Sequence, residues 1–149
     1  MPHLSGQVTL WGPLINVLVG VSGPRGAALT AAGQPIPAPV VARMVVDTGA
    51  SLSAVDCTIL QQLGLQPTGQ IALHTPSTQG VPHSANQFDA SLTIYGAVPG
   101  SLPVYAAQAL PVVDGSFKPQ GIDGLVGRDV LAGARMIYGG PDSWYGISF

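Results

Sequence analysis

The chain has 149 residues, the length of one ordinary domain, and its composition is 46% hydrophobic and only 8% charged. The formal net charge is −2, every acidic residue is an aspartate and the few basic residues are scattered, which excludes a basic surface for nucleic acid. With 20 glycines, 14 prolines and few stretches of helical period, the sequence predicts a mostly β fold of short strands joined by turns.

Signals of targeting and of redox compartment are weak. Cys57 stands alone, so an intrachain disulfide is impossible. The first six residues lack the basic start of a signal peptide, and the apolar stretch 10–21 is too short and too interrupted to span a membrane. We therefore expect a cytoplasmic protein with no membrane partner, and the low charge favours an oligomer.

Apolar alternation and runs of β-branched residues predict strands through much of the chain. In chain order, the expected strands are 7–11, 14–21, Val40–Val46, 52–55, 70–74, 87–95, 101–107, 109–113, 136–138 and 143–149. A Gly-Pro turn separates the first two strands, and residues 22–39 are expected to form a long loop around a short strand. The small polar residues 75–80 are expected at the tip of an extended hairpin, and residues 139–142 in the turn of a terminal one.

Two short helices are expected. The first, 56–63, places Ile59, Leu60 and Leu63 on one face and has Asp56 or Ser53 as its cap. The second, 128–134, follows a glycine that ends a short apolar strand, and residues 118–121 before it are expected to form a loop. Because no internal repeat or linker divides the sequence, we expect residues 1–149 to form a single domain.

The strand Val40–Val46 runs directly into Asp47, followed by Thr48, Gly49, Ala50 and Ser51. A charged group at the end of a buried strand is costly unless it is paired or hydrogen-bonded, and Gly49 lets the backbone turn sharply and approach whatever lies over the carboxylate. Taken alone, Asp-Thr-Gly favours an ordinary strand end followed by an Asx turn. The apolar run before it and the small residues after it favour a functional carboxylate.

A second motif, Leu125-Val126-Gly127-Arg128-Asp129-Val130-Leu131, follows about 80 residues later. The pair of motifs resembles the retropepsin-like aspartic peptidases, single-lobe relatives of pepsin that work as homodimers. The resemblance covers roughly residues 40–149, and the order and spacing of the two motifs make it more specific than either alone. It implies a single-lobe, acid-protease-like closed β-barrel with one or two short helices.

The resemblance also implies roles for individual residues. The catalytic loop would be Asp47, Thr48 and Gly49, with Thr48 bonding across a twofold axis. Residues expected to bind substrate are Gly49, Ala50 and Ser51 of the loop and Ser77, Thr78, Gln79 and Gly80 of the hairpin tip, which matches the family's flap. Residues expected to support the site are Leu125, Val126, Gly127, Arg128 and Asp129.

Peptide hydrolysis by carboxylates needs one general base and one general acid. The chain has a single Asp-Thr-Gly, because Asp114-Gly115 and Asp123-Gly124 lack the hydroxyl residue and are more typical of turns. The second carboxylate would then be Asp47 of another copy, and two carboxylates in contact share one proton. We expect an aspartic endopeptidase acting on peptide or protein substrates as a homodimer, without metal or cofactor.

Other interpretations carry less weight. The family domain could serve as an inactive dimerisation or peptide-binding module, or the chain could be an unrelated β-barrel. Cys57 with His74 or His83 could form a thiol–imidazole pair, although a core cysteine is the better interpretation, and the three histidines lack metal-ligand spacing. Asp89 and Asp129 are candidates either for groups that support the site or for capping groups. The aromatic strand 143–149 is a candidate part of the dimer interface.

Overall fold

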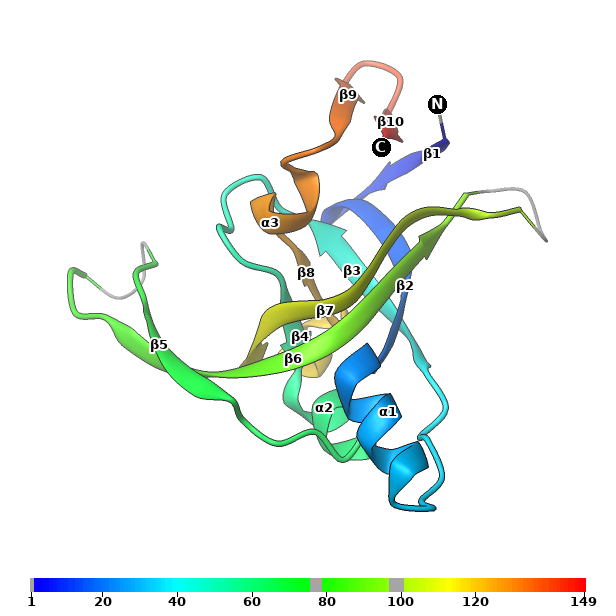
Figure 1. Ribbon diagram of the computed structural model, residues 1–149. Coiled ribbons are helices and arrows are strands. Elements are labelled where there is room, and N and C mark those ends of the chain that lie inside the picture. Colours follow the sequence, from blue (N-terminus) through cyan, green and yellow to red (C-terminus); the bar gives the residue numbers. More distant parts are fainter. Residues whose placement is uncertain (1, 76–78, 97–100) are drawn as a thin grey trace.

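The computed structural model describes residues 2–75, 79–96 and 101–149 (Figure 1). Their elements are, in order, β1 (His3–Thr9), β2 (Gly12–Val21), α1 (Gly23–Ala31), β3 (Val40–Val46), β4 (Ala54–Asp56), α2 (Cys57–Gln62), β5 (Gly69–Leu73), β6 (His83–Tyr95), β7 (Pro103–Gly115), the 3-10 turn η2 (Lys118–Gln120), β8 (Gly124–Val126), α3 (Arg128–Leu131), β9 (Arg135–Gly139) and β10 (Trp144–Ser148).

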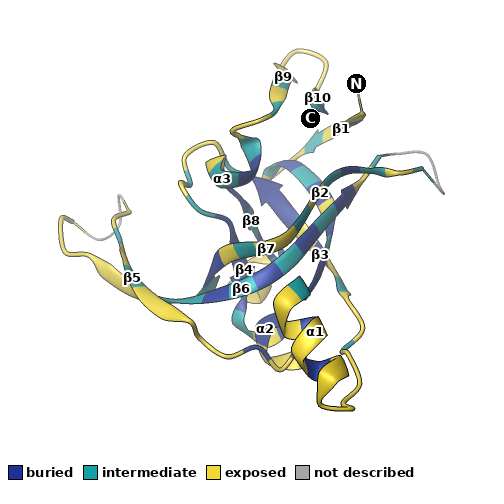
Figure 2. Ribbon diagram, in the orientation of Figure 1, coloured by how far each residue is buried: buried dark blue, intermediate teal, exposed yellow. Residues whose placement is uncertain are grey.

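Six of these strands form a closed barrel. They follow one another in the order β6-β7-β4-β8-β3-β2, and β2 pairs back with β6 through Val17–Val21 and residues 90–94. Alternate residues of β2, β3 and β6 point inward, so that Val17, Met44 and Leu92 are fully buried. Figure 2 shows this buried band running through the barrel strands. The expected mostly β, closed-barrel fold is confirmed.

Two extensions continue the barrel sheet. At one end, β5 pairs only with the outer part of β6 and is largely exposed (Figure 2). At the other end, β1 pairs with β2 and then with β10, which pairs with β9. The expected terminal hairpin is present as β9 and β10. Both edges of β10 are therefore occupied, and β9 is the free edge at this end of the sheet.

The segment expected to be a long loop contains helix α1, so this expectation was wrong. The Ser22 side chain accepts a hydrogen bond from the backbone N–H of Arg25, and a proline stands in the first turn. Gly33, with a φ of +67°, follows the end of the helix, and Leu29 is buried beneath it. The helix, with its serine cap, brings the described helices to three, one more than expected.

Several boundaries also differ from expectation: β6 begins at His83 and not at 87, β4 is Ala54–Asp56 and not 52–55, and the helix expected at 128–134 ends at Leu131. The first strand occupies His3–Thr9, and its turn is at Leu10–Trp11, so Gly12 and Pro13 begin β2 instead of forming the turn. The two strands expected at 101–107 and 109–113 are one strand, β7. A bulge between the pairs Ala90↔Leu110 and Leu92↔Ala107 gives β7 one extra residue, which lets it continue.

The helix expected at 56–63 is present as α2, and Asp56 is its cap. Asp56 Oδ1 accepts from the N–H and hydroxyl of Thr58, while Oδ2 accepts from the N–H groups of Phe117 and Lys118. Burial raises the pKa of this carboxyl, but the hydrogen bonds from Thr58, Lys118 and Phe117 outweigh burial and lower the pKa from 3.8 to about 2. Asp56 thus ties α2 to the turn η2.

Asp56→Asn is expected to lower the free energy of unfolding by about 2 kcal/mol near neutral pH, the amount that corresponds to this change in pKa. A carboxylate whose folded pKa lies below its unfolded one stabilises the fold above the unfolded pKa of 3.8, and loses that contribution as the pH falls toward about 2. Urea unfolding of both proteins, followed by tryptophan fluorescence, should show a difference in the free energy of unfolding that becomes smaller as the pH falls. A gap of equal size at pH 7 and pH 3 would contradict this explanation.

Candidate functional site

Asp47 lies directly after the buried end of β3. The pair Val46↔Val126 is the last of the parallel β3–β8 pairing, and the Asp47 N–H donates to the Val126 carbonyl at 2.9 Å. Asp47 is half-buried, whereas Thr48 and Gly49 are exposed. The structure therefore brings the two sequence motifs together at one end of the barrel.

The backbone turns immediately after the carboxylate. The Gly49 N–H donates to Asp47 Oδ1 at 2.8 Å, and the Ala50 N–H donates to the Asp47 carbonyl at 3.2 Å. This is the local geometry of an Asx turn, and it fixes the direction of the Asp47 side chain. One carboxylate oxygen is thus oriented by the loop itself.

The second motif holds this loop from beneath. The Arg128 N–H donates to the Ala50 carbonyl at 2.9 Å, while the exposed Arg128 side chain points to solvent. Ser53 Oγ accepts from the Gly127 N–H at 3.0 Å and donates to Asp129 Oδ1 at 2.8 Å, and the Ser53 N–H donates to Asp129 Oδ2 at 2.8 Å. From the sequence, Asp129 was expected to support the site or to cap a helix, and Ser53 was expected only as a helix cap. A serine within the apolar stretch 52–55, which was expected to be a strand, was the signal, because a buried hydroxyl needs hydrogen-bond partners; Ser53 is fully buried just before β4.

Gly127 is required by a close approach of backbone. A Cβ at this position would lie 2.7 Å from the carbonyl carbon and oxygen of Leu52 and 3.0 Å from the Ala50 carbonyl oxygen. Its φ of −93° is accessible to any residue, so space, and not backbone conformation, demands glycine here. Leu125 is half-buried and Val126 fully buried in the strand that leads to it.

The remaining residues expected to bind substrate belong to the β5–β6 hairpin. Ser77 and Thr78 lie outside the described residues. Gln79 and Gly80 are exposed and have positive φ angles of 46° and 84°. In Figure 1 the hairpin and the loop after β3 project from the same side of the barrel. Ser51, the last residue of the loop motif, is exposed.

The weaker candidates are not brought together into a site. Cys57 is half-buried at the start of α2, and His3, His74 and His83 are exposed. Within residues 2–75, 79–96 and 101–149 no group of three His, Cys or Asp side chains is placed to hold a metal ion. Tyr145 is a core residue whose hydroxyl donates to the Leu14 carbonyl at 3.0 Å, whereas Tyr138 is exposed.

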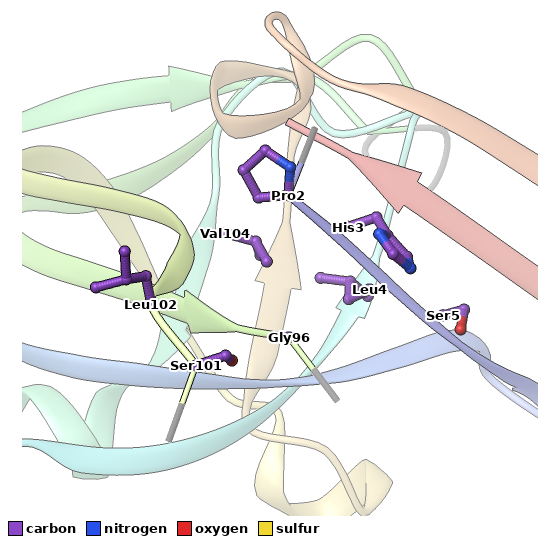
Figure 3. A pocket seen from close by; sticks show the side chains of 8 residues that line it. All are labelled: Pro2, His3, Leu4, Ser5, Gly96, Ser101, Leu102 and Val104. Atoms are coloured by element: carbon purple, nitrogen blue, oxygen red, sulfur yellow. The ribbon is translucent and has the colours of Figure 1, made fainter. Parts of the chain in front are cut away.

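A cavity of about 190 Å³ lies between the start of β1, the end of β6 and the start of β7 (Figure 3). It is lined by Pro2, His3, Leu4, Ser5, Gly96, Ser101, Leu102 and Val104. None of these belongs to residues 47–53 or 125–129. The cavity is therefore lined by residues other than those of the two motifs.

Comparisons with known proteins agree with this geometry. A family model described as aspartyl protease matches residues 28–130, which include the first motif and the second as far as Val130. The fold is similar to the crystal structure of a retropepsin-like aspartic protease from Rickettsia conorii, with a TM-score of 0.54 and 18% sequence identity over 99% of this chain and 90% of that chain. The comparison with curated proteins gives no match. None of the helices among the described residues has the length and apolar character needed to cross a membrane.

Proposed function

The chain belongs to the retropepsin-like aspartyl protease family, and from this premise we propose that it is an aspartic endopeptidase whose site contains Asp47 from each of two copies. The observation that carries the proposal is the position of Asp47 in an exposed Asp-Thr-Gly turn that the Gly127–Asp129 segment holds rigid. A carboxylate held in this way at a solvent-facing strand end suits the activation of a water molecule.

Four other buried or half-buried carboxylates, those of Asp56, Asp114, Asp123 and Asp129, already have structural partners, and Asp89 lies in the middle of β6. Asp56 caps α2, Asp114 accepts from Asn86, and Asp129 accepts from Ser53. Asp123 Oδ2 accepts from the Arg43 N–H at 2.8 Å, and its Oδ1 lies 3.5 Å from Lys118 Nζ. These bonds support a second copy as the source of the second catalytic carboxylate.

In the proposed mechanism the two Asp47 carboxylates share one proton. The ionised carboxylate takes a proton from water as the water attacks the peptide carbonyl, and the protonated one donates to the substrate. Thr48 bonds to the partner loop, and the backbone of Gly49, Ala50 and Ser51 binds the peptide as an added strand. Gln79 and Gly80 contact it from the hairpin side. Residues 1–149 form one peptidase domain in this proposal, and no metal or cofactor is needed.

Exposed apolar side chains support a partner at this end of the barrel. Leu10, at the β1–β2 turn, is 99% exposed. The pair Leu14↔Val45 places that turn at the end of β3 from which Asp47 follows. The strand 143–149, our candidate for the interface, has both backbone edges occupied. In the proposal this strand therefore contributes only side chains to the dimer interface. Ile137 and Tyr138 are exposed on β9, the free edge of the sheet, and are better placed to contact a partner copy.

Subunit mixing tests the shared site. Wild-type protein at fixed concentration is mixed with an equal amount of the Asp47→Asn variant, and peptide cleavage is followed after exchange. Activity should fall to about half, because random pairing leaves about half of the wild-type copies in mixed dimers with a single carboxylate. The Asp142→Asn variant, altered in an exposed turn, is the control and should leave activity unchanged. If mixed dimers are shown to have formed and activity is still undiminished, each copy works alone.

A further inference from the structure

Strand β6 leaves the barrel at one identifiable residue. Its inner part pairs with β7 as far as Gln87↔Val113, and its outer part, residues 83–86, pairs only with β5. Beyond Val113, strand β7 turns to β4 through the pairs Val55↔Asp114 and Asp56↔Gly115. Asn86 and Asp114 therefore face each other across a fork, where the ladder between the two backbones has ended.

A side-chain network bridges this fork. Asp114 Oδ1 accepts from the Asn86 N–H at 2.9 Å, and Oδ2 accepts from Asn86 Nδ2 at 3.0 Å. Asn86 Oδ1 in turn accepts from Gln70 Nε2 at 3.3 Å. We call Gln70, Asn86 and Asp114 the root network. The carboxylate replaces the backbone carbonyl that β7 no longer supplies, and its bonds are charge-assisted.

A small apolar cluster beneath the root network connects the hairpin to the loop after Asp47. Ala54, Ala85 and Val113 are its buried members, with Leu52, Ile71 and Leu73 among the residues packed against them. Leu52 and Ala54 follow the Asp47 turn, and Ile71, Leu73 and Ala85 belong to the two hairpin arms. The orientation of the hairpin relative to Asp47 is therefore set at this root.

We propose that Asp114 is a positioning residue that, through Asn86, fixes the angle at which the β5–β6 hairpin leaves the barrel. That angle sets the space between the hairpin and the Asp47 loop in which a peptide strand would bind. The inference rests on the proposed peptidase function for its kinetic consequence. Its structural consequence, the order of the hairpin arms, is independent of activity.

Asp114→Asn tests the role with little change of shape. The new amide group would face the Asn86 amide group, donor against donor, so one of the two bonds is lost. We expect KM for a peptide to rise about tenfold while kcat stays within about twofold, because binding is weakened and the carboxylates are untouched. Amide hydrogen exchange of Gly69–Leu73 should accelerate about tenfold.

The reciprocal exchange provides a rescue. In the double variant Asn86→Asp with Asp114→Asn, an amide again faces a carboxylate, and the contacts of the Asn86 backbone N–H and of Gln70 are kept. KM and the amide hydrogen-exchange rates of Gly69–Leu73 should both return to their wild-type values. Asn86→Asp alone sets two carboxylates against each other. It should therefore raise KM and accelerate hydrogen exchange more than Asp114→Asn does. If either single variant fails to fold, Gln70→Ala can be used, because it removes only the exposed outer member of the root network. It should raise KM and accelerate hydrogen exchange by about two- to threefold.

Specific results would overturn the inference. Unchanged exchange of Gly69–Leu73 in Asp114→Asn, a loss in kcat with constant KM, or a double variant no better than the singles would each do so. The variant Asp142→Asn, in the turn before β10, controls for the loss of one negative charge and should match wild type in both measurements. A wild-type protein without peptidase activity would overturn the proposed function instead, and the exchange data alone would then decide the role of the root network.

Discussion

Asp47→Asn is expected to reduce peptide cleavage about a thousandfold or more, since it removes the acid–base group from both halves of the proposed site. The fold should persist. An asparagine Oδ1 still accepts from the Gly49 N–H, the 2.8 Å bond that orients the turn, so the free energy of unfolding should change by less than about 1 kcal/mol. Initial cleavage rates on a peptide library and thermal unfolding of the same preparations provide the measurement.

The matched control is Asp89→Asn, which removes a half-buried aspartate from the middle of β6, away from both motifs. It should retain activity. Cleavage by Asp47→Asn at the wild-type rate would move the chemistry elsewhere, and Cys57→Ala would then be the next variant to measure. Loss of activity accompanied by unfolding would leave the catalytic role of Asp47 unsupported.

Gly127→Ala is expected to damage both stability and activity. The added methyl group would lie 2.7 Å from the Leu52 carbonyl, which is backbone and cannot rotate away. The segment 50–53 must shift, and this strains the Ser53 bonds to Gly127 and Asp129. We expect a loss of about 2–3 kcal/mol in the free energy of unfolding, as measured by urea denaturation. Activity, assayed where the variant is still folded, should fall by more than the folded fraction explains.

Gly133→Ala is the matched control for this substitution. Gly133 is exposed, and a Cβ there would meet no atom within 4 Å. Its unfolding should differ from wild type by less than about 0.5 kcal/mol. If Gly127→Ala behaved like Gly133→Ala, the close contact between the two motifs would not determine the geometry of the loop.

Sequence patterns predicted those elements whose formation depends on residues close together in the chain. Helix α2 was found from its Asp56 cap and its apolar face, and the terminal hairpin from its turn residues. Helix α1 was missed because its glycine, proline and alanine content favoured a loop, although Ser22 and the proline after it are an N-cap pattern.

Contacts between distant segments escaped prediction. The bonds of Ser53 to Gly127 and Asp129 join residues 74 and 76 positions apart, and those of Asn86 to Asp114 join residues 28 apart. Nothing local distinguishes Asp114-Gly115 from an ordinary turn, so its role at the fork could not be deduced before the path of β7 was known. The roles of Asp47, Thr48 and the hairpin tip in catalysis remain predictions for the experiments above.

The parallel pairing of β3 with β8 also sets the order of events during synthesis. Residues Met44–Val46 pair with Gly124–Val126, about 80 residues later, so closing this loop is entropically costly and comes late in folding. A nascent chain that has emerged as far as α2 already contains Asp47 but lacks the strand and glycine that support its turn. The Asp47 loop can therefore acquire this support only after residues 124–129, about 80 residues further along the chain, have also left the ribosome.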